Sequence, residues 1–236
     1  MSSLDPGCPG WSVQDLVAHM ANTFWAVVDL SQLPDITGQS FERGQEIWVE
    51  SRRGLRPEAV LADYEQVSSA ALDRLAGLAQ LDMQVPLAEA GTYPAAVLPS
   101  AYGFDHYTHI RADLFAPRGP LDGEPPPSDE LRIGSALDWI EAALPQQNKA
   151  AADQATLEIR VTGAGGRVIT FGSGPVKAMV TSDAPAFVRW GVLTALPGQR
   201  HQGCRRSSAA RVAGPAMACA CEPRCCRCSL THSRCG

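Results

Sequence analysis

In several stretches between residues 13 and 144, hydrophobic residues recur every three to four positions, and this spacing is typical of amphipathic helices. The first such stretch follows Trp11, where Ser12 is suited to cap a helix and Asp15 stands in the capping-box position. His19 falls on the flank of the apolar stripe, as expected of a residue that lines a cleft at the edge of a core. The stripe consists of Val13, Leu16, Val17, Met20, Phe24 and Val27.

Four further stretches show the same helical spacing. The sequence predicts a short helix over 41–53 and a long one over 57–78, which has proline in its favourable first turn. Another helix is expected over 99–115, and one more over 131–144. Residues 80–92 are polar and irregular, so no regular element is predicted there.

The pattern changes beyond residue 154, where apolar and polar residues alternate. Residues 156–162 alternate strictly, 163–166 read Gly-Ala-Gly-Gly, and 167–171 form a second alternating run, which together predict a β-hairpin. A third strand over 176–181 and a short helix over 185–192 are expected to follow. The predicted fold class is therefore mainly α, with a helical bundle followed by a small α+β unit.

A proline-rich stretch separates these two parts. Residues 116–129 hold five prolines and three acidic residues, as is typical of a linker. The chain is therefore divided into a helical bundle over 1–118, a linker and connecting helix over 119–150, a partial α+β domain over 151–192 and a tail over 193–236.

The composition is that of a globular protein, with 45% hydrophobic and 19% charged residues. The sequence has no apolar run long enough to cross a membrane and no secretory signal, so a cytoplasmic protein is expected. The net charge of -5 includes seven Arg and one Glu beyond residue 198, so the preceding body is more acidic than the total suggests. An acidic body has no electrostatic footprint for nucleic acid, and neither nucleic acid nor membrane is expected as a partner.

The tail differs in composition from the body. Seven of the eight cysteines lie between Cys204 and Cys235, and residues 200–236 contain no Ile, Phe, Trp or Tyr. Such a segment buries too little apolar surface to offset its chain entropy, so we expect a disordered tail, as from an out-of-frame reading. The alternative is a tail zinc site, for which four ligands stand at knuckle-like spacing: Cys225, Cys228, His232 and Cys235.

Candidate chemistry gathers on two of the predicted helices. His19 lies on the first, and Asp105 and His109 lie one turn apart on the helix over 99–115. Three protein ligands with an open fourth position form a catalytic divalent-metal site, although each of these residues alone is more often an ordinary surface or core residue than a ligand. His106 is a competing ligand on a different face. Asp113, one turn after His109, is suited to orient the His109 ring from behind.

The segment from Cys8 to His19, Cys-Pro-Gly-Trp-Ser-Val-Gln-Asp-Leu-Val-Ala-His, resembles the opening motif of the mycothiol-dependent maleylpyruvate isomerase family, within the DinB-like metal-binding helical bundles. The resemblance covers roughly residues 6–190. It implies that His19 is the first metal ligand, and that Asp105 and His109 complete the set as the carboxylate and the histidine four residues later. It also implies a sterol-carrier-like α+β domain at the C-terminus.

Three features of the chain bear on this resemblance. The family usually presents Glu where this chain has Asp105, so the carboxylate arm is shorter. Cys8 invites interpretation as a nucleophile, but in the resembled motif it stands at the start of a helix, which favours a structural role. Family members usually have a complete helix before this motif, whereas seven residues precede Cys8 here. We therefore expect either a start further upstream or a three-helix remnant of the bundle.

The resemblance implies an enzyme that uses a divalent metal, with zinc the expected ion, and mycothiol as thiol cosubstrate. The implied partners are a low-molecular-weight thiol and a small unsaturated or electrophilic substrate, and the implied activity is isomerisation or thiol transfer. Two alternatives remain open at this level: a non-catalytic metal-binding or regulatory bundle, and an inactive truncated relative.

Overall fold

The computed structural model describes residue 8 and residues 10–87, 90–115 and 119–195. All of these described residues belong to one compact unit, residues 1–199, and the rest of the chain, 200–236, is counted as a separate unit. All of the second unit lies outside the described residues. The tail cysteines and their alternative zinc set, Cys225, Cys228, His232 and Cys235, lie there too.

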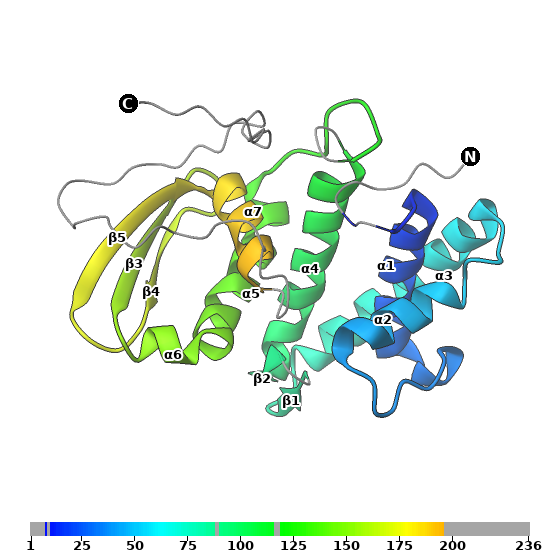
Figure 1. Cartoon of the computed structure of the whole chain (residues 1–236), viewed down its shortest axis with the longest axis horizontal. Helices are drawn as coiled ribbons and strands as arrows, with labels where there is room; N and C mark the ends of the chain where they lie inside the picture. The colour runs from blue at the N-terminus through cyan, green and yellow to red at the C-terminus, as the bar shows by residue number, and fades with distance from the viewer. Residues whose placement is uncertain (1–7, 9, 88–89, 116–118, 196–236) are drawn as a thin grey trace, which may run out of the picture. The chain divides into compact units, whose positions relative to one another are not determined.

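The helical bundle is built from four α-helices: α1 (Val13–Val28), α2 (Phe41–Glu50), α3 (Pro57–Leu78) and α4 (Leu98–Thr108). Helix α4 continues directly as a π-helix over His109–Leu114, and a short 3-10 turn spans Leu30–Gln32. Figure 1 shows α4 beside α1 and α3 on one side and α5 on the other, and the packing contacts agree.

The core between α1 and α3 follows from the apolar stripes of both helices. Phe24 on α1 is 6% exposed, and its ring stacks on Tyr64 of α3 at 5.9 Å between centroids and on Tyr102 of α4 at 6.2 Å. This aromatic stack ties α4 to the two longer helices. The remaining buried members of this core are Ala21, Val67, Ala71 and Leu75.

The start of α1 is fixed by a capping box. The Ser12 hydroxyl oxygen accepts a hydrogen bond from the backbone N–H of Asp15 at 3.2 Å, and the Asp15 carboxylate accepts one from the backbone N–H of Ser12 at 2.8 Å. These bonds satisfy backbone donors that the first turn of a helix leaves without partners. They also fix the register from which His19 is placed seven residues later.

We predict that Ser12→Ala lowers the free energy of unfolding by about 0.5–2 kcal/mol, because it removes this cap. Urea unfolding followed by circular dichroism measures the change. Ser69→Ala, at an exposed position of α3, is the matched control and should shift stability by less than about 0.5 kcal/mol. Equal effects of the two substitutions would contradict a specific role for the cap.

A small two-stranded antiparallel sheet connects α3 to α4, where the sequence predicts no regular element. Strand β1 (Gln84–Pro86) pairs with β2 (Thr92–Pro94), with Val85 opposite Tyr93. The Tyr93 side chain is fully buried, and its hydroxyl donates a hydrogen bond to the Ala90 carbonyl at 2.6 Å. Burial of this one tyrosine therefore organises a segment that has no helical or alternating pattern.

The C-terminal part is an α+β unit made of α5 (Glu130–Gln147), α6 (Lys149–Ala152), β3 (Thr156–Thr162), β4 (Arg167–Phe171), β5 (Val176–Asp183) and α7 (Ala184–Ala195). The strand order is β4-β3-β5, with β3 antiparallel to β4 and parallel to β5. The predicted fold class, a helical bundle followed by a small α+β part, is confirmed. The buried core of this part includes Ile133, Leu137, Ile140, Ile159, Val161, Ile169, Phe187 and Val188.

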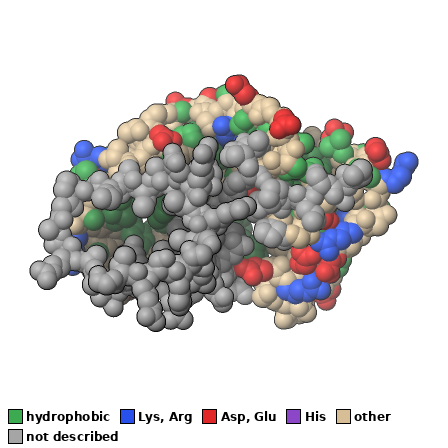
Figure 2. Space-filling view, turned by 45° about the horizontal axis from the view of Figure 1, so that its top comes forward, with side chains coloured by type: hydrophobic (Ala, Val, Ile, Leu, Met, Phe, Trp, Pro, Cys, Tyr) green, Lys and Arg blue, Asp and Glu red, His purple; other side chains and the backbone are tan. Residues whose placement is uncertain are grey.

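The surface of the described residues is charged and mixed in sign. Acidic and basic side chains lie beside one another on the face drawn in Figure 2. Around α2, Arg43 pairs with Glu50 at 3.0 Å and Arg53 with Glu46 at 2.8 Å. In the part of the chain that the structure describes, no helix has both the length and the apolar character that a membrane crossing requires.

Candidate metal centre

Helix α1 places His19 at the boundary between the core and α4. The side chain is 9% exposed, and its ring lies 5.2 Å from the Trp11 ring between centroids. Its Nε2 atom faces α4 and lies 3.4 Å from Asp105 Oδ1. The position on the flank of the apolar stripe therefore brings the imidazole to a helix 86 residues away in sequence.

Helix α4 and the π-helix place the other two predicted ligands, Asp105 and His109, next to His19. Asp105 and His109 are one helical turn apart, and His109 Nε2 lies 3.4 Å from the same Asp105 Oδ1 atom. The rings of His19 and His109 meet edge to face, with centroids 5.0 Å apart. Each of the three residues offers one ligand atom, and these atoms all lie within 4.8 Å of one another.

The two spacings of 3.4 Å fit metal ligands better than ion pairs. A charge-assisted hydrogen bond between an imidazole and a carboxylate is about 2.7–2.9 Å long. Nitrogen and oxygen ligands at about 2.05 Å from a tetrahedral ion stand roughly 3.3 Å apart. The buried Asp105 Oδ2 atom has no hydrogen-bond partner among the described residues. The donor set and its spacing therefore fit a divalent cation.

Asp113 lies directly behind His109. Its buried carboxylate oxygen Oδ2 is 2.8 Å from His109 Nδ1, so it accepts the Nδ1–H hydrogen bond. This bond leaves the lone pair of the neutral imidazole on Nε2, which faces Asp105 and His19. The intervening residues form the π-helix, a local widening that recurs at functional sites.

The group is electrostatically coupled. Burial opposes the charged form of the Asp105 carboxylate, but His109 and His19 hold the pKa of this carboxylate well below its usual range. Burial also opposes protonation of His109, but the negative charge of Asp105 and the side-chain hydrogen bonds of His109 with Asp105, Asp113 and Cys8 hold the pKa of His109 well above its usual range. Without a cation, the surroundings of His109 therefore favour its protonated form.

This electrostatic state predicts proton release upon metal binding. A cation bound to His109 Nε2 displaces the proton that the raised pKa retains, so roughly one proton per metal should be released at pH 7. Affinity should then fall about tenfold for each pH unit below that pKa. Calorimetric titrations at pH 7 in buffers of different ionisation enthalpy measure the proton count. A binding heat that does not depend on the buffer would contradict the prediction.

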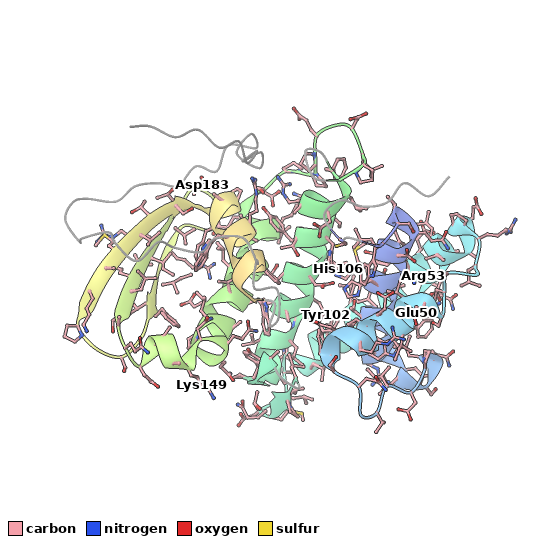
Figure 3. The ribbon with its side chains drawn as sticks, in the orientation of Figure 1. Glu50, Arg53, Tyr102, His106, Lys149 and Asp183 are labelled. Carbon is pink, nitrogen blue, oxygen red and sulfur yellow. The ribbon has the colours of Figure 1, made fainter. Side chains whose placement is uncertain are left out.

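His106, the competing ligand, lies outside this group. Figure 3 labels it on α4 together with Tyr102, whose carbonyl accepts the His106 Nδ1–H hydrogen bond at 3.1 Å. The imidazole stacks on Phe24 at 4.4 Å between centroids, and burial lowers its pKa. His106 is therefore a neutral histidine packed among aromatic rings. It serves as a natural control for the two histidines of the metal group, by which we mean His19, Asp105 and His109.

Cys8 lies closer to the site than its position at the start of a helix suggests. Cys8, His109 and Asp113 also offer ligand atoms that lie within 4.8 Å of one another. The capping signal of Ser12 predicts where α1 begins, but the direction of the chain before the cap depends on a turn at Gly10, whose φ is +92°. Sequence reasoning therefore missed the contact between Cys8 and His109.

Two cavities of about 450 and 440 Å³ lie away from the metal group. The first is lined by residues that include Trp25, Arg52 and Asp63, and Trp25 donates its indole N–H to Asp63 at 3.0 Å. The second includes Leu30 and Trp48. Neither cavity is lined by a residue of the metal group, so neither supplies its substrate chamber.

Comparison with known proteins finds similarity in a family model and in solved structures. Residues 5–112 match the family model described as the mycothiol maleylpyruvate isomerase N-terminal domain. A crystal structure of the mycothiol-dependent maleylpyruvate isomerase is similar to this chain with a TM-score of 0.50 and 16% identity, covering 79% of this chain and 75% of the other. A histidine-to-alanine variant of that enzyme gives a TM-score of 0.50 and 14% identity, covering 80% and 77%. None of the curated proteins matches the sequence.

The structural similarity and the family-model match cover different parts of the chain. The structural similarity extends from the helical bundle into the α+β part, so it shows the fold of most of the chain. The family model matches the bundle and includes all three residues of the predicted metal group, His19, Asp105 and His109. Asp113 and the α+β part lie beyond the matched residues.

Proposed function

Because residues 5–112 belong to the mycothiol maleylpyruvate isomerase N-terminal domain family, we propose that this chain is a divalent-metal-binding, mycothiol-dependent isomerase or thiol transferase. His19, Asp105 and His109 would hold the metal, and Asp113 would orient His109. The observation that carries the proposal is the convergence of two imidazole Nε2 atoms on Asp105 Oδ1, each at 3.4 Å.

Each residue of the group has a separate task in this proposal. Asp113 keeps the proton of neutral His109 on Nδ1, so that Nε2 presents a lone pair toward the cation. Asp105 contributes the negative charge that offsets part of the cation's charge. His19 enters from the other side of the group and completes three ligands, which leaves a fourth position for a thiol or water. Two imidazoles and a carboxylate suit zinc, iron or nickel, and among these we propose zinc as the ion.

A divalent metal held by His19, Asp105 and His109 would supply Lewis acidity, which lowers the pKa of a thiol bound to it so that thiolate would be available at neutral pH. In the isomerisation that we propose, the thiolate sulfur forms a bond to one carbon of a conjugated cis double bond. Rotation about the resulting single bond follows, and the carbon–sulfur bond then breaks to give the trans isomer and the unchanged thiol. In the transferase alternative, the carbon–sulfur bond to an electrophilic substrate is retained.

The compartment follows from the chemistry of the thiol. We propose a cytoplasmic protein, because Cys8 is the one cysteine of the first 198 residues, which is typical of proteins kept under reducing conditions. A reducing compartment also keeps a low-molecular-weight thiol cosubstrate in its active form.

The proposal predicts an ordered dependence of stability on metal and thiol. Mycothiol at about 100 times its Kd should stabilise the zinc-loaded protein by about 2.7 kcal/mol and leave the metal-free protein unchanged. Thermal unfolding with zinc and thiol, separately and together, measures this dependence.

The matching activity assay uses a small cis-unsaturated dicarboxylic acid with and without the thiol. Stabilisation by zinc without any thiol effect or turnover would favour the alternative, a non-catalytic metal-binding bundle. Stabilisation by neither would favour an inactive relative. Turnover that does not require thiol would contradict the proposal directly.

A further inference from the structure

A second group of ligand-type side chains meets the metal group at His109. Cys8, His109 and Asp113 offer a sulfur, a nitrogen and a carboxylate oxygen that all lie within 4.8 Å of one another. Cys8 and His109 are partly exposed, while Asp113 is buried. We call this the outer group, and His19, Asp105 and His109 the inner group.

The backbone at the start of α1 holds Cys8 in this place. The Trp11 backbone N–H donates a hydrogen bond to the Cys8 carbonyl at 3.0 Å, and Gly10 makes the turn possible with its φ of +92°. The Trp11 indole N–H donates to Glu46 Oε2 on α2 at 2.7 Å, which anchors the turn to the bundle. The position of the thiol is thus determined by the same turn that begins the helix of His19.

His109 takes part in both groups through different atoms. Its Nε2 faces Asp105 and His19 in the inner group, whereas its Nδ1 faces Asp113 at 2.8 Å in the outer group. A side-chain hydrogen bond also links His109 to Cys8. One neutral imidazole cannot bind a cation through both nitrogens, because one of them carries the proton. The two groups therefore exclude each other as metal sites.

We propose that Cys8, His109 and Asp113 form a second metal-binding set that takes a thiophilic divalent cation when the inner group is unavailable. A thiolate, an imidazole and a carboxylate are a zinc-type donor set, and the sulfur shifts its preference toward softer ions. Ligand atoms around one such ion stand roughly 3.3–3.8 Å apart, so the observed limit of 4.8 Å requires at most about 1.5 Å of side-chain adjustment. This site does not depend on the proposed reaction.

Cobalt(II) is the probe that separates the two groups. Cobalt bound to a thiolate gives a near-ultraviolet charge-transfer absorption, which nitrogen and oxygen ligands alone do not give. The experiment uses the full chain with its seven tail cysteines replaced by serine, so that Cys8 is the one thiol present. In this background, one equivalent of cobalt should enter the inner group without the charge-transfer band. With His19→Ala added, cobalt in excess should give the band.

Two matched variants complete the test. Cys8→Ser should abolish the charge-transfer band in the His19→Ala background, and by itself should leave the metal content of the inner group unchanged. His109→Ala should abolish both forms of binding. The inference is overturned if His19→Ala gives no thiolate band, or if the band survives Cys8→Ser. Because the readout is cobalt absorption, absence of thiol-dependent turnover would count against the proposed function and not against this site.

Discussion

His109→Ala is expected to reduce the metal content of the purified protein from about one ion per chain to almost none, and to abolish thiol-dependent activity. The reason is that His109 supplies a ligand to the inner group through Nε2 and contacts the outer group through Nδ1. His106 also lies near the Asp105 carboxylate, with Nδ1 at 3.6 Å from Oδ2, but its Nδ1–H is bound to the Tyr102 carbonyl, so it is not oriented to replace His109. Elemental analysis after dialysis measures the loss.

His106→Gln is the matched control for this prediction. It removes an imidazole from the same helix, three residues before His109, but one whose Nδ1–H is bound to the Tyr102 carbonyl. The variant should keep its metal, although it should lose some stability because the stack on Phe24 is disturbed. Equal metal loss in both variants would mean that the loss reflects disruption of α4 rather than removal of a ligand.

The second large effect is expected at Asp113. Asp113→Ala should weaken zinc binding by about 10–100-fold, which corresponds to about 1.4–2.7 kcal/mol, because His109 loses the acceptor that fixes its tautomer and ring orientation. Competition with a chromophoric zinc chelator measures the affinity. Activity at saturating zinc should recover in large part, since the three ligands of the inner group remain.

Asp113→Asn separates orientation from charge at this position. The amide oxygen can still accept the His109 Nδ1–H hydrogen bond, so this variant should bind zinc more tightly than Asp113→Ala. Unchanged affinity in Asp113→Ala would contradict an orienting role. A loss as complete as in His109→Ala would instead make Asp113 a direct ligand in the resting protein.

Helices and strands with a regular hydrophobic period could be predicted from the sequence. The helix expected over 57–78 is α3, and the hairpin strands expected over 156–162 and 167–171 are β3 and β4. In each case one face is buried along the whole element, so the period of the sequence is the period of the structure. The helix expected over 41–53 ends earlier, at Glu50, because the residues after it form turns.

Elements whose place depends on single contacts could not be predicted from the sequence. Strands β1 and β2 are three residues long and end in Pro86 and Pro94, so they are too short to show an alternating pattern in the sequence. The buried Tyr93 side chain determines their place. The π-helix over His109–Leu114 is another example. A helical period looks the same in sequence whether the local hydrogen bonds are of the α or the π type.

The candidate site was also predictable from the sequence only in part. The sequence could place His19 on a flank of one helix, and Asp105 and His109 on one face of another. That these helices bring the three side chains together is a property of packing, which depends on contacts such as that of Phe24 with Tyr64 and Tyr102. The shorter arm of Asp105, where the family usually has Glu, still reaches both imidazoles at 3.4 Å.

Crystallographic location of the metal tests the central claim most directly. Anomalous diffraction at the zinc edge, from crystals of the full chain grown with zinc, shows the ion without reference to activity. The account predicts one strong peak between the Nε2 atoms of His19 and His109, next to the Asp105 carboxylate. A peak among the tail cysteines with none at this position would contradict the account and favour the alternative zinc site formed by Cys225, Cys228, His232 and Cys235.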